Sequence, residues 1–290
     1  MNRKMIFLAI LILALASLAC SVNINLPDWQ VVTGPTETEN ISVPLLPDTQ
    51  AIPDVTLKFA AGTLSLQPGA EGALVAGTAT YNVTDLKPTV STENGNVLIE
   101  TGNFDMKGLP KLNQDVINNW ELKLGASPMR LVINAGAYQG DYELGGLSLE
   151  RLQIEDGASQ VDVSFSTPNL AQMSSLQYST GASQVSLKGL ANANTTDMTF
   201  RGGAGEYTLD FSGELRNNMD VNIESGVSSV TIIVPEGVSA QVISDSGFTT
   251  VSTSGSWKQN GNTYQLTGSG NTITINVKIG AGSLNLDTSR

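Results

Sequence analysis

Hydrophobic and polar residues alternate along short segments that recur through the second half of the chain. In one segment, Leu152 and Ile154 precede Gly157, and Val161 and Val163 follow it. Branched and aromatic residues at a period of two predict β-strands with one buried face. The same arrangement surrounds five glycines along the chain: Gly157, Gly181, Gly203, Gly226 and Gly280.

The spacing of these glycines predicts a structural unit that repeats. The first four lie 24, 22 and 23 residues apart. Within a unit, seven positions separate Ile154 from Val161, and because seven is odd, a straight strand would turn its second apolar set to the other face. We therefore expect two strands with a corner at the glycine, which tolerates positive φ and close backbone approach. The small residue that follows it, such as Ala158, is expected to point inward.

Such units cover their apolar faces only by stacking, so we predict an all-β protein. The favoured architecture is a β-solenoid of two-strand repeats of roughly 22–24 residues each. An antiparallel meander with a hairpin loop at each glycine is the alternative. Looser versions of the pattern around Gly62, Gly102 and Gly136 predict further coils, the last with two extra residues after its glycine.

One segment departs from the strand pattern. Apolar residues at helical spacing follow Pro110 and predict a short helix, or a loop that caps the stack, near residues 110–120. These residues are Leu112, Val116, Ile117 and Trp120. Strand alternation resumes in the segment 120–124, so we expect an N-terminal β region over 53–150 that continues into a repeat-rich region over 151–290.

The N-terminus has the plan of an export signal. Arg3 and Lys4 precede an apolar run that ends just before Cys20, the only cysteine. The run is short for a membrane span and typical of a secretory signal over residues 1–20. It resembles a bacterial lipoprotein signal, which implies that Cys20 is lipidated and anchors the chain at the extracytoplasmic face of the cell membrane. A signal peptide cut near Ala19 and an uncleaved anchor are the alternatives.

Residues 21–52 are predicted to form a flexible tether. Prolines alternate there with polar residues and no periodicity is sustained. A flexible chain of about 30 residues reaches roughly 30 Å on average, which would hold the folded body clear of the lipid.

Composition excludes several classes of function. The chain has a formal net charge of −12 and no histidine. An acidic chain without basic runs does not suit nucleic-acid binding. The absence of histidine excludes Ser-His-Asp and Cys-His nucleophile systems and histidine zinc sites. With Cys20 as the only thiol, no disulfide framework or thiolate metal site is expected, and no cofactor is predicted.

Carboxylate chemistry is the remaining route to an enzyme or a metal site. Acids lie near Arg151 at positions that paired-acid cleavage of polysaccharides could use: Glu143, Glu150, Glu155, Asp156 and Asp162. We interpret them as a solvated acidic face and predict no catalytic residue. The glycine-and-aspartate nonapeptide of calcium-binding repeats is missing, so Asp210 and Asp287 are expected to serve turn geometry, and no metal is predicted.

One tryptophan is a weak candidate for ligand binding. Trp257 lies in the polar segment SGSWKQNGN, whereas Trp29 and Trp120 lie in less polar settings. Its ring could stack on a sugar. The alternative is a tryptophan near a hairpin tip that packs on the terminal coils, which the Asn260-Gly261 step supports by favouring a tight turn.

Several longer motifs are similar to one known family. They are GDYELGGLSLERLQIEDGASQVDV, GGAGEYTLDFSG, GVSSVTIIVPEGVSAQV and the closing IGAGSLNLD. Their order and spacing resemble the toastrack family of bacterial extracytoplasmic β proteins, related to cell-wall-active antibiotics response proteins and adhesin-like domains. The resemblance covers roughly Ile52 to Arg290. It implies a right-handed stacked-β body outside the cytoplasm and carries over no catalytic residue.

Three functions are compatible with these features. The first is a non-catalytic, adhesin-like surface lipoprotein that binds an envelope glycan, a polymer or another cell. The second is a sensor or modulator of envelope stress that acts through a membrane-protein partner, and the third is a structural envelope lipoprotein. In addition, a last coil at Ile273 to Leu286 would leave an open strand edge that could pair with another copy.

Overall fold

The computed structural model describes residues 33–46, 52–102, 116–245 and 247–289. These residues form a 16-stranded sheet, and the helices among them are two short 3₁₀ turns, η1 (Thr84–Leu86) and η2 (Leu190–Ala193). The all-β prediction is confirmed. No helix in these ranges is long and apolar enough to cross a membrane. The expected signal and Cys20 lie outside the described residues, as do residues 21–32 and 47–51 of the expected tether. The tether is wrong for residues Glu37–Pro44, which form a strand paired antiparallel with Ala73–Tyr81 instead of a flexible chain.

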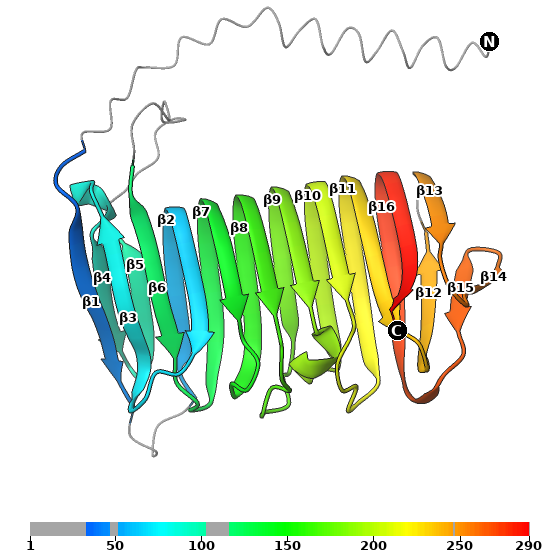
Figure 1. The fold of residues 1–290 in the computed structure, drawn as a ribbon, viewed down its shortest axis with the longest axis horizontal. Helices are drawn as coiled ribbons and strands as arrows, with labels where there is room; N and C mark the ends of the chain where they lie inside the picture. Colours follow the sequence, from blue (N-terminus) through cyan, green and yellow to red (C-terminus); the bar gives the residue numbers. More distant parts are fainter. Residues whose placement is uncertain (1–32, 47–51, 103–115, 246, 290) are drawn as a thin grey trace, which may run out of the picture. The chain divides into compact units, whose positions relative to one another are not determined.

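Seven long strands form the centre of the sheet, hydrogen-bonded side by side in parallel (Figure 1). In spatial order they are β2 (Asp54–Pro68), β7 (Met129–Glu143), β8 (Leu149–Ser164), β9 (Leu176–Lys188), β10 (Asp197–Asp210), β11 (Met219–Pro235) and β16 (Ser269–Ser289). From β7 to β11, each strand pairs in parallel with the strand one repeat further along the chain, which is the arrangement of a stacked coil. The solenoid-like stack is therefore confirmed for these coils, and the antiparallel meander is wrong.

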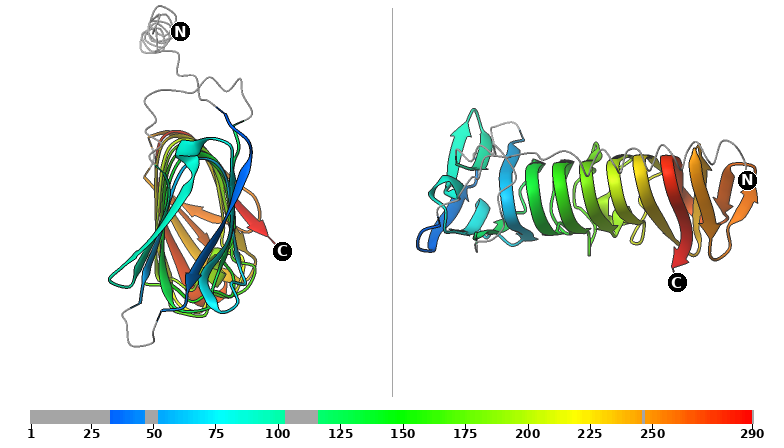
Figure 2. Two further views of the ribbon diagram at one scale, coloured as in Figure 1. Left: turned by 90° about the vertical axis from the view of Figure 1, so that its left-hand side faces the viewer. Right: turned by 90° about the horizontal axis from the view of Figure 1, so that it is seen from above.

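Each long strand curves around the interior, as the end-on view in Figure 2 shows. In β8, Leu152 and Ile154 are buried before the glycine, and Val161 and Val163 are buried after it. The inward positions thus change from even to odd across the bend, as the spacing predicted. One detail differs from the expectation: the parallel ladder continues through the bend, so each unit is one bent strand rather than two separate ones.

The hydrophobic core fills the space between the two halves of each bent strand. Its largest fully buried side chains are aromatic, and they contact one another both between neighbouring coils and across the interior of one coil. The ring centroids of Tyr178 and Phe200 lie 5.5 Å apart, and those of Phe200 and Tyr207 lie 4.9 Å apart. Nearer the N-terminal end, Phe59 and Trp120 meet at 5.1 Å. Aromatic contacts of this kind add to the stability that burial alone provides.

At the N-terminal end, two separate strands replace a bent one. β5 (Asn96–Thr101) pairs with the first half of β2, and β6 (Asn118–Leu124) pairs with the second half. Antiparallel strands cover both: β4 (Pro88–Glu93) pairs with β5, and β3 (Ala73–Tyr81) pairs with β6 and with β1 (Glu37–Pro44).

The prediction of a short helix near residues 110–120 is wrong for residues 116–120, the part of this segment that the structure describes. Val116 and Ile117 precede β6, and Trp120 is a fully buried residue of that strand. Trp120 alternates with exposed neighbours inside a paired ladder, so sheet pairing overrides the helical spacing of the sequence. Residues 110–115 lie outside the described part of the chain.

The C-terminal end is also built from half-length strands. β12 (Val238–Ser244) and β13 (Phe248–Thr253) pair with the two halves of β16. β15 (Thr263–Leu266) pairs antiparallel with β12, and β14 (Lys258–Asn260) pairs with β15. The expectation that Ile273 to Leu286 forms the last coil is therefore wrong: β16 returns to lie between β11 and the pair β12 and β13.

The coil around Gly136 lacks the two-residue insertion that the sequence predicted. β7 and β8 stay in register after the bend, with Tyr138 opposite Ser159 and Gly140 opposite Val161. Gly140 occupies a core position where other coils have an apolar side chain. The rings of Tyr138 and Tyr142 fill that space, since a Cβ on Gly140 would lie 2.9 and 3.0 Å from them.

Candidate binding site at the bend

The repeat glycines stack in a column along the bend. A Cβ on Gly181 would lie 2.4 Å from the carbonyl oxygen of Gly157, and one on Gly203 would lie 2.4 Å from that of Gly181. Gly226 and Gly280 repeat the contact at 2.6 and 2.8 Å from the glycine of the preceding coil. None of the five glycines has a positive φ. Close approach of neighbouring backbones, and not unusual dihedral angles, therefore requires glycine in this column.

The residue after each glycine does not point inward, contrary to the expectation. Ala158 and Ala182 are exposed, whereas Ser183, two residues after its glycine, is 8% exposed. The hydroxyl groups of Ser159 and Ser183 lie 2.9 Å apart across neighbouring coils. The serine has the same parity as the buried residues that follow it, such as Val161, so the inward set begins at the serine rather than at the alanine.

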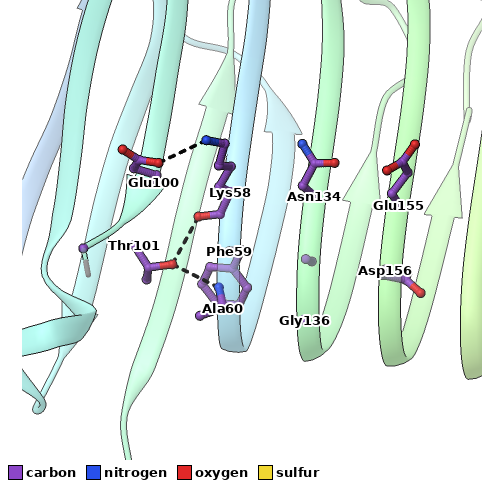
Figure 3. Close-up of a pocket in the computed structure, with 11 residues that line it drawn as sticks. Lys58, Phe59, Ala60, Glu100, Thr101, Asn134, Gly136, Glu155 and Asp156 are labelled. Atoms are coloured by element: carbon purple, nitrogen blue, oxygen red, sulfur yellow. Dashed lines mark hydrogen bonds and ion pairs between the residues drawn. The ribbon is translucent and has the colours of Figure 1, made fainter. Parts of the chain in front are cut away.

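A pocket of about 500 Å³ opens at the bend near the N-terminal end of the glycine column (Figure 3). It lies over β2, β5, β7 and β8. The residues that line it are Lys58, Phe59, Ala60, Glu100, Thr101, Gly102, Asn134, Ala135, Gly136, Glu155 and Asp156. Two acids that the sequence suggested, Glu155 and Asp156, are thus part of one pocket together with an amide and a cation.

One wall of the pocket is held by polar contacts between β2 and β5. Lys58 Nζ lies 3.4 Å from Glu100 Oε2. The Thr101 hydroxyl donates to the carbonyl oxygen of Lys58 at 3.1 Å and accepts from the amide of Ala60 at 3.0 Å. Both charged side chains of the ion pair are more than a third exposed, so the pair is weak in water but supplies both donor and acceptor groups to a ligand.

The opposite wall contains Asp156, whose carboxylate is bound by the hydroxyls of two neighbouring coils. Oδ2 accepts from Tyr178 at 2.7 Å and from Tyr138 at 3.3 Å, and Oδ1 accepts from Thr180. Burial, together with the nearby negative charge of Asp156, raises the pKa of Tyr138 and of Tyr178 well above the ordinary value. Both tyrosines therefore remain neutral donors, and Asp156 serves to hold the coils together.

The other candidate acids lie apart from the pocket. Glu143 accepts the amide of Gly145 at 2.7 Å and the hydroxyl of Ser164 at 2.7 Å. Burial raises the pKa of Glu143, but these hydrogen bonds outweigh it, and the pKa lies below its ordinary value. Asp162 pairs with Lys188 at 2.8 Å.

The cation among these candidates is engaged elsewhere. Arg151 Nη2 lies 3.2 Å from Asp54 Oδ1, and Arg130 Nε lies 2.7 Å from the same oxygen. Glu150 lies at the start of β8, where its carbonyl oxygen accepts from Ser174. The five candidate acids and Arg151 thus make separate contacts. They do not form a pair of acids beside a free cation.

Within the described ranges, no three acidic, histidine or cysteine side chains lie close enough together to hold a metal ion. Asp210 accepts the amide of Ser212 at 2.9 Å, which is a turn contact. Asp287 lies in β16 opposite Ile233.

Trp257 is partly buried and packs on the hydrophobic core. It lies just before the hairpin of β14 and β15, whose loop contains Gly261 at a φ of 62°.

Comparison with known proteins places this architecture in a family. The sequence profile of the N-terminal domain of toast_rack, DUF2154, matches residues 32–174 and, in a second match, residues 169–233. Together the two matches span more than half of the chain. The chain belongs to the toast_rack family. The family resemblance noted in the sequence is thereby confirmed, and the matches cover strands β1 to β10 and most of β11 of this toast_rack protein.

Similar solved structures come from several bacteria. One is a proposed cell adhesion protein from Clostridium sporogenes, with 19% identity and a TM-score of 0.48 over 88% of this chain and 100% of that one. Another is a proposed adhesin from Bacteroides fragilis, with 11% identity and a TM-score of 0.34 over 87% and 97%. A proposed lipid binding protein from Parabacteroides distasonis has 11% identity and a TM-score of 0.37 over 89% and 98%. No curated protein matches the chain.

Sequence reasoning missed one further feature of this toast_rack chain, a row of uncharged polar side chains on the outside of the first strand halves. Register places these residues opposite one another in successive strands: Gln153, Gln177, Thr199, Asn222 and Asn276. The signal was present in the sequence, since each residue lies between the two apolar residues that precede its glycine. Only the pairing register shows that the five positions form one continuous row.

Proposed function

We propose that this protein is a non-catalytic, adhesin-like binding protein of the bacterial envelope whose ligand is a polymer rich in hydroxyl and amide groups, such as a glycan. The observation that best supports this proposal is the outer polar row, defined as Gln153, Gln177, Thr199, Asn222 and Asn276. Neighbouring strands lie about 4.8 Å apart, so the row presents similar hydrogen-bonding groups at a constant interval. A repetitive ligand laid across the strands can contact each group in turn.

The outer polar row leads toward the bend pocket. Gln153 Nε2 donates to Glu155 Oε1 at 2.8 Å, and Glu155 lines the pocket. At the other end of the row, Asn276 Nδ2 lies 3.3 Å from Asn222 Oδ1. The row carries no charge itself, although the whole chain has a net charge of −12. A neutral polar strip on an acidic protein favours an uncharged polar ligand over a polyanion.

The bend pocket suits the binding of a polymer end more than a chemical reaction. Asp156 is held by three hydroxyl groups, while Lys58 and Glu100 neutralise each other. A general acid and base would need free carboxylates poised on opposite sides of a substrate. The pocket instead offers amide, carboxylate and ammonium groups that can hydrogen-bond to a sugar.

Binding to isolated envelope glycans tests the proposal. A variant with both Gln177→Ala and Asn222→Ala should bind at least about five-fold more weakly, since each lost hydrogen bond contributes about 0.5–1.5 kcal/mol. The matched control carries Gln184→Ala and Ser229→Ala, which lie in register on the second strand halves. Equal loss in both variants, or no binding of the unsubstituted protein to any envelope polymer, would refute the proposal.

We further propose that Cys20 anchors the protein by lipidation at the extracytoplasmic face of the membrane. The apolar run that ends just before this cysteine supports the proposal. Metabolic labelling with a fatty acid should label the protein and should fail with Cys20→Ala, which should move from the membrane to the soluble fraction. Unchanged membrane association of Cys20→Ala would argue for an uncleaved apolar anchor instead.

A further inference from the structure

Four strands form the outer edges of the described sheet, and three of them carry features that oppose pairing. β1 contains Glu37, Glu39 and Pro44, and β4 contains proline and glutamate. β14 is three residues long. Charge, proline and short length are the usual means of protecting a strand edge. β13, with the sequence FTTVST, has none of the three.

The architecture of the two ends singles out the same strand. Three of the four half-length strands that close the stack are covered by an antiparallel strand: β5 by β4, β6 by β3, and β12 by β15. Within the described residues, β13 pairs with β16 and with no other strand. One antiparallel strand is therefore missing from an otherwise consistent pattern.

We infer that β13 is a homodimerisation edge, at which the β13 strand of a second copy supplies the missing antiparallel strand. Antiparallel pairing of identical strands generates a closed twofold interface, so it stops at a dimer and does not extend into a fibre. The inference concerns a surface separate from the proposed ligand row and does not depend on the ligand.

Side-chain direction limits the register of such a dimer. Directly opposite residues in an antiparallel pair lie on the same face of the sheet. In β13, Val251 packs against the core and Thr250 is exposed. Exposed residues must therefore oppose exposed residues, so a residue of β13 lies opposite its own copy on the twofold axis. The two registers that keep most of this six-residue strand paired place Thr250 or Val251 on that axis. In the second register, the two Val251 side chains meet on the core side and extend the hydrophobic interior across the dimer.

Exposure and charge support a second copy as the partner. Phe248 is 90% exposed, and it is the most exposed of the large hydrophobic residues in the described chain. An antiparallel partner strand passing beside it would cover part of the ring. Two copies with a net charge of −12 repel each other over most of their surfaces, and an uncharged strand is where their backbones can approach. Association should accordingly strengthen with salt, which screens the repulsion.

Sedimentation equilibrium of the full chain in mild detergent tests the inference. We expect a reversible monomer–dimer equilibrium, and Thr250→Lys should raise the dissociation constant at least about ten-fold. The two introduced lysines lie directly opposite each other when the axis passes through Thr250 and diagonally when it passes through Val251, so like charges repel in both registers. Phe248→Ser is expected to weaken the dimer without a charge change. The matched controls are Thr89→Lys and Val90→Ser on the protected edge strand β4, which should leave the equilibrium unchanged.

Disulfide crosslinking tests the register. The variant Thr250→Cys, alone or mixed with Ser252→Cys, should form a covalent dimer on oxidation, whereas Thr89→Cys should give no more than the unsubstituted chain, in which Cys20 sets the background. A protein that is monomeric at every concentration overturns the inference. So does a dimer that persists in Thr250→Lys and Phe248→Ser while each variant retains the melting temperature of the unsubstituted protein.

Discussion

The central coils and the two ends of the stack obtain their hydrogen bonds in different ways. In the centre, one bent strand per repeat pairs in parallel on both sides, and the glycine column lets successive backbones approach closely at the bend. At the ends, separate short strands replace the bent one, and antiparallel strands cover three of the four half-length strands. The centre is therefore specified by repetition, and each end by its own local sequence.

This difference teaches where the protein tolerates change. A residue in the centre contacts equivalent residues in the coils on both sides, so a defect there affects three coils. A residue in an outermost strand, such as β13, has a paired strand on one side only, and the effect of its loss is more local. Nearest-neighbour energetics of this kind is general for stacked repeats.

The largest expected effect comes from opening a cavity in the central core. Phe200→Ala removes a fully buried ring that contacts Tyr178 and Tyr207. It should lower the free energy of unfolding by about 3–5 kcal/mol, measured by chemical denaturation. Phe248→Ala at the C-terminal end removes the same ring from a 90% exposed position and should change stability by less than about 0.5 kcal/mol. Similar losses in both variants would contradict the comparison.

A smaller effect is expected at the bend. Gly181→Ala would place a Cβ 2.4 Å from a backbone oxygen of the preceding coil, and the neighbouring coils must separate to accept it. Overpacking of this kind should cost about 1–3 kcal/mol in the free energy of unfolding. Gly157→Ala, where the same distance is 3.1 Å, should cost less, and the exposed Ala182→Ser should cost almost nothing. An equal loss at Gly181 and Ala182 would refute the close-approach explanation.

The effect expected to be smallest near neutral pH, where it is absent, is a dependence of stability on alkaline pH. Burial raises the pKa of Tyr138 and of Tyr178 in the folded protein above the value of 10 that applies to the unfolded chain. Their contribution to stability is therefore complete below pH 10 and is lost as the pH rises above it. Each tyrosine contributes a slope of up to about 1.4 kcal/mol per pH unit.

Thermal melting between neutral and strongly alkaline pH measures this slope. Tyr178→Phe should reduce the steepness of the decline above pH 10, even though the substitution also removes a hydrogen bond to Asp156 and lowers stability at neutral pH. The two effects are separable because the slope, and not the absolute melting temperature, reports the titration. A melting temperature that stays constant above pH 10 would show that these tyrosines do not couple to folding.

The candidate site was predictable only in part. The sequence marks Glu155 and Asp156 as acids of interest, but nothing in it places them beside Lys58, Glu100 and Asn134 in one pocket. Those residues come from strands far apart in the chain, and only the parallel register brings them together. The hydroxyl groups that bind Asp156 likewise come from neighbouring coils, and nothing in the linear spacing marks them as its partners.

The ends of the fold were the least predictable. The helical spacing around Val116 and Ile117 predicts a helix. In the structure these residues lead into β6, whose alternate side chains are buried in the core. The return of β16 to pair with β11 places four shorter strands outside it, although they precede it in sequence. Sequence order could not reveal this, because a strand has no local feature that identifies its neighbour.

What the sequence determined by itself was the class of the fold, the repeat and the change of buried face at each glycine. These follow from local rules: a period of two in apolar residues, a constant repeat length and an odd interval across the bend. What only the tertiary structure decided was which strands lie side by side, why glycine is required and which edge is left open. Those outcomes depend on backbone contacts between segments that are distant in sequence, and such contacts exist only once the coils have stacked.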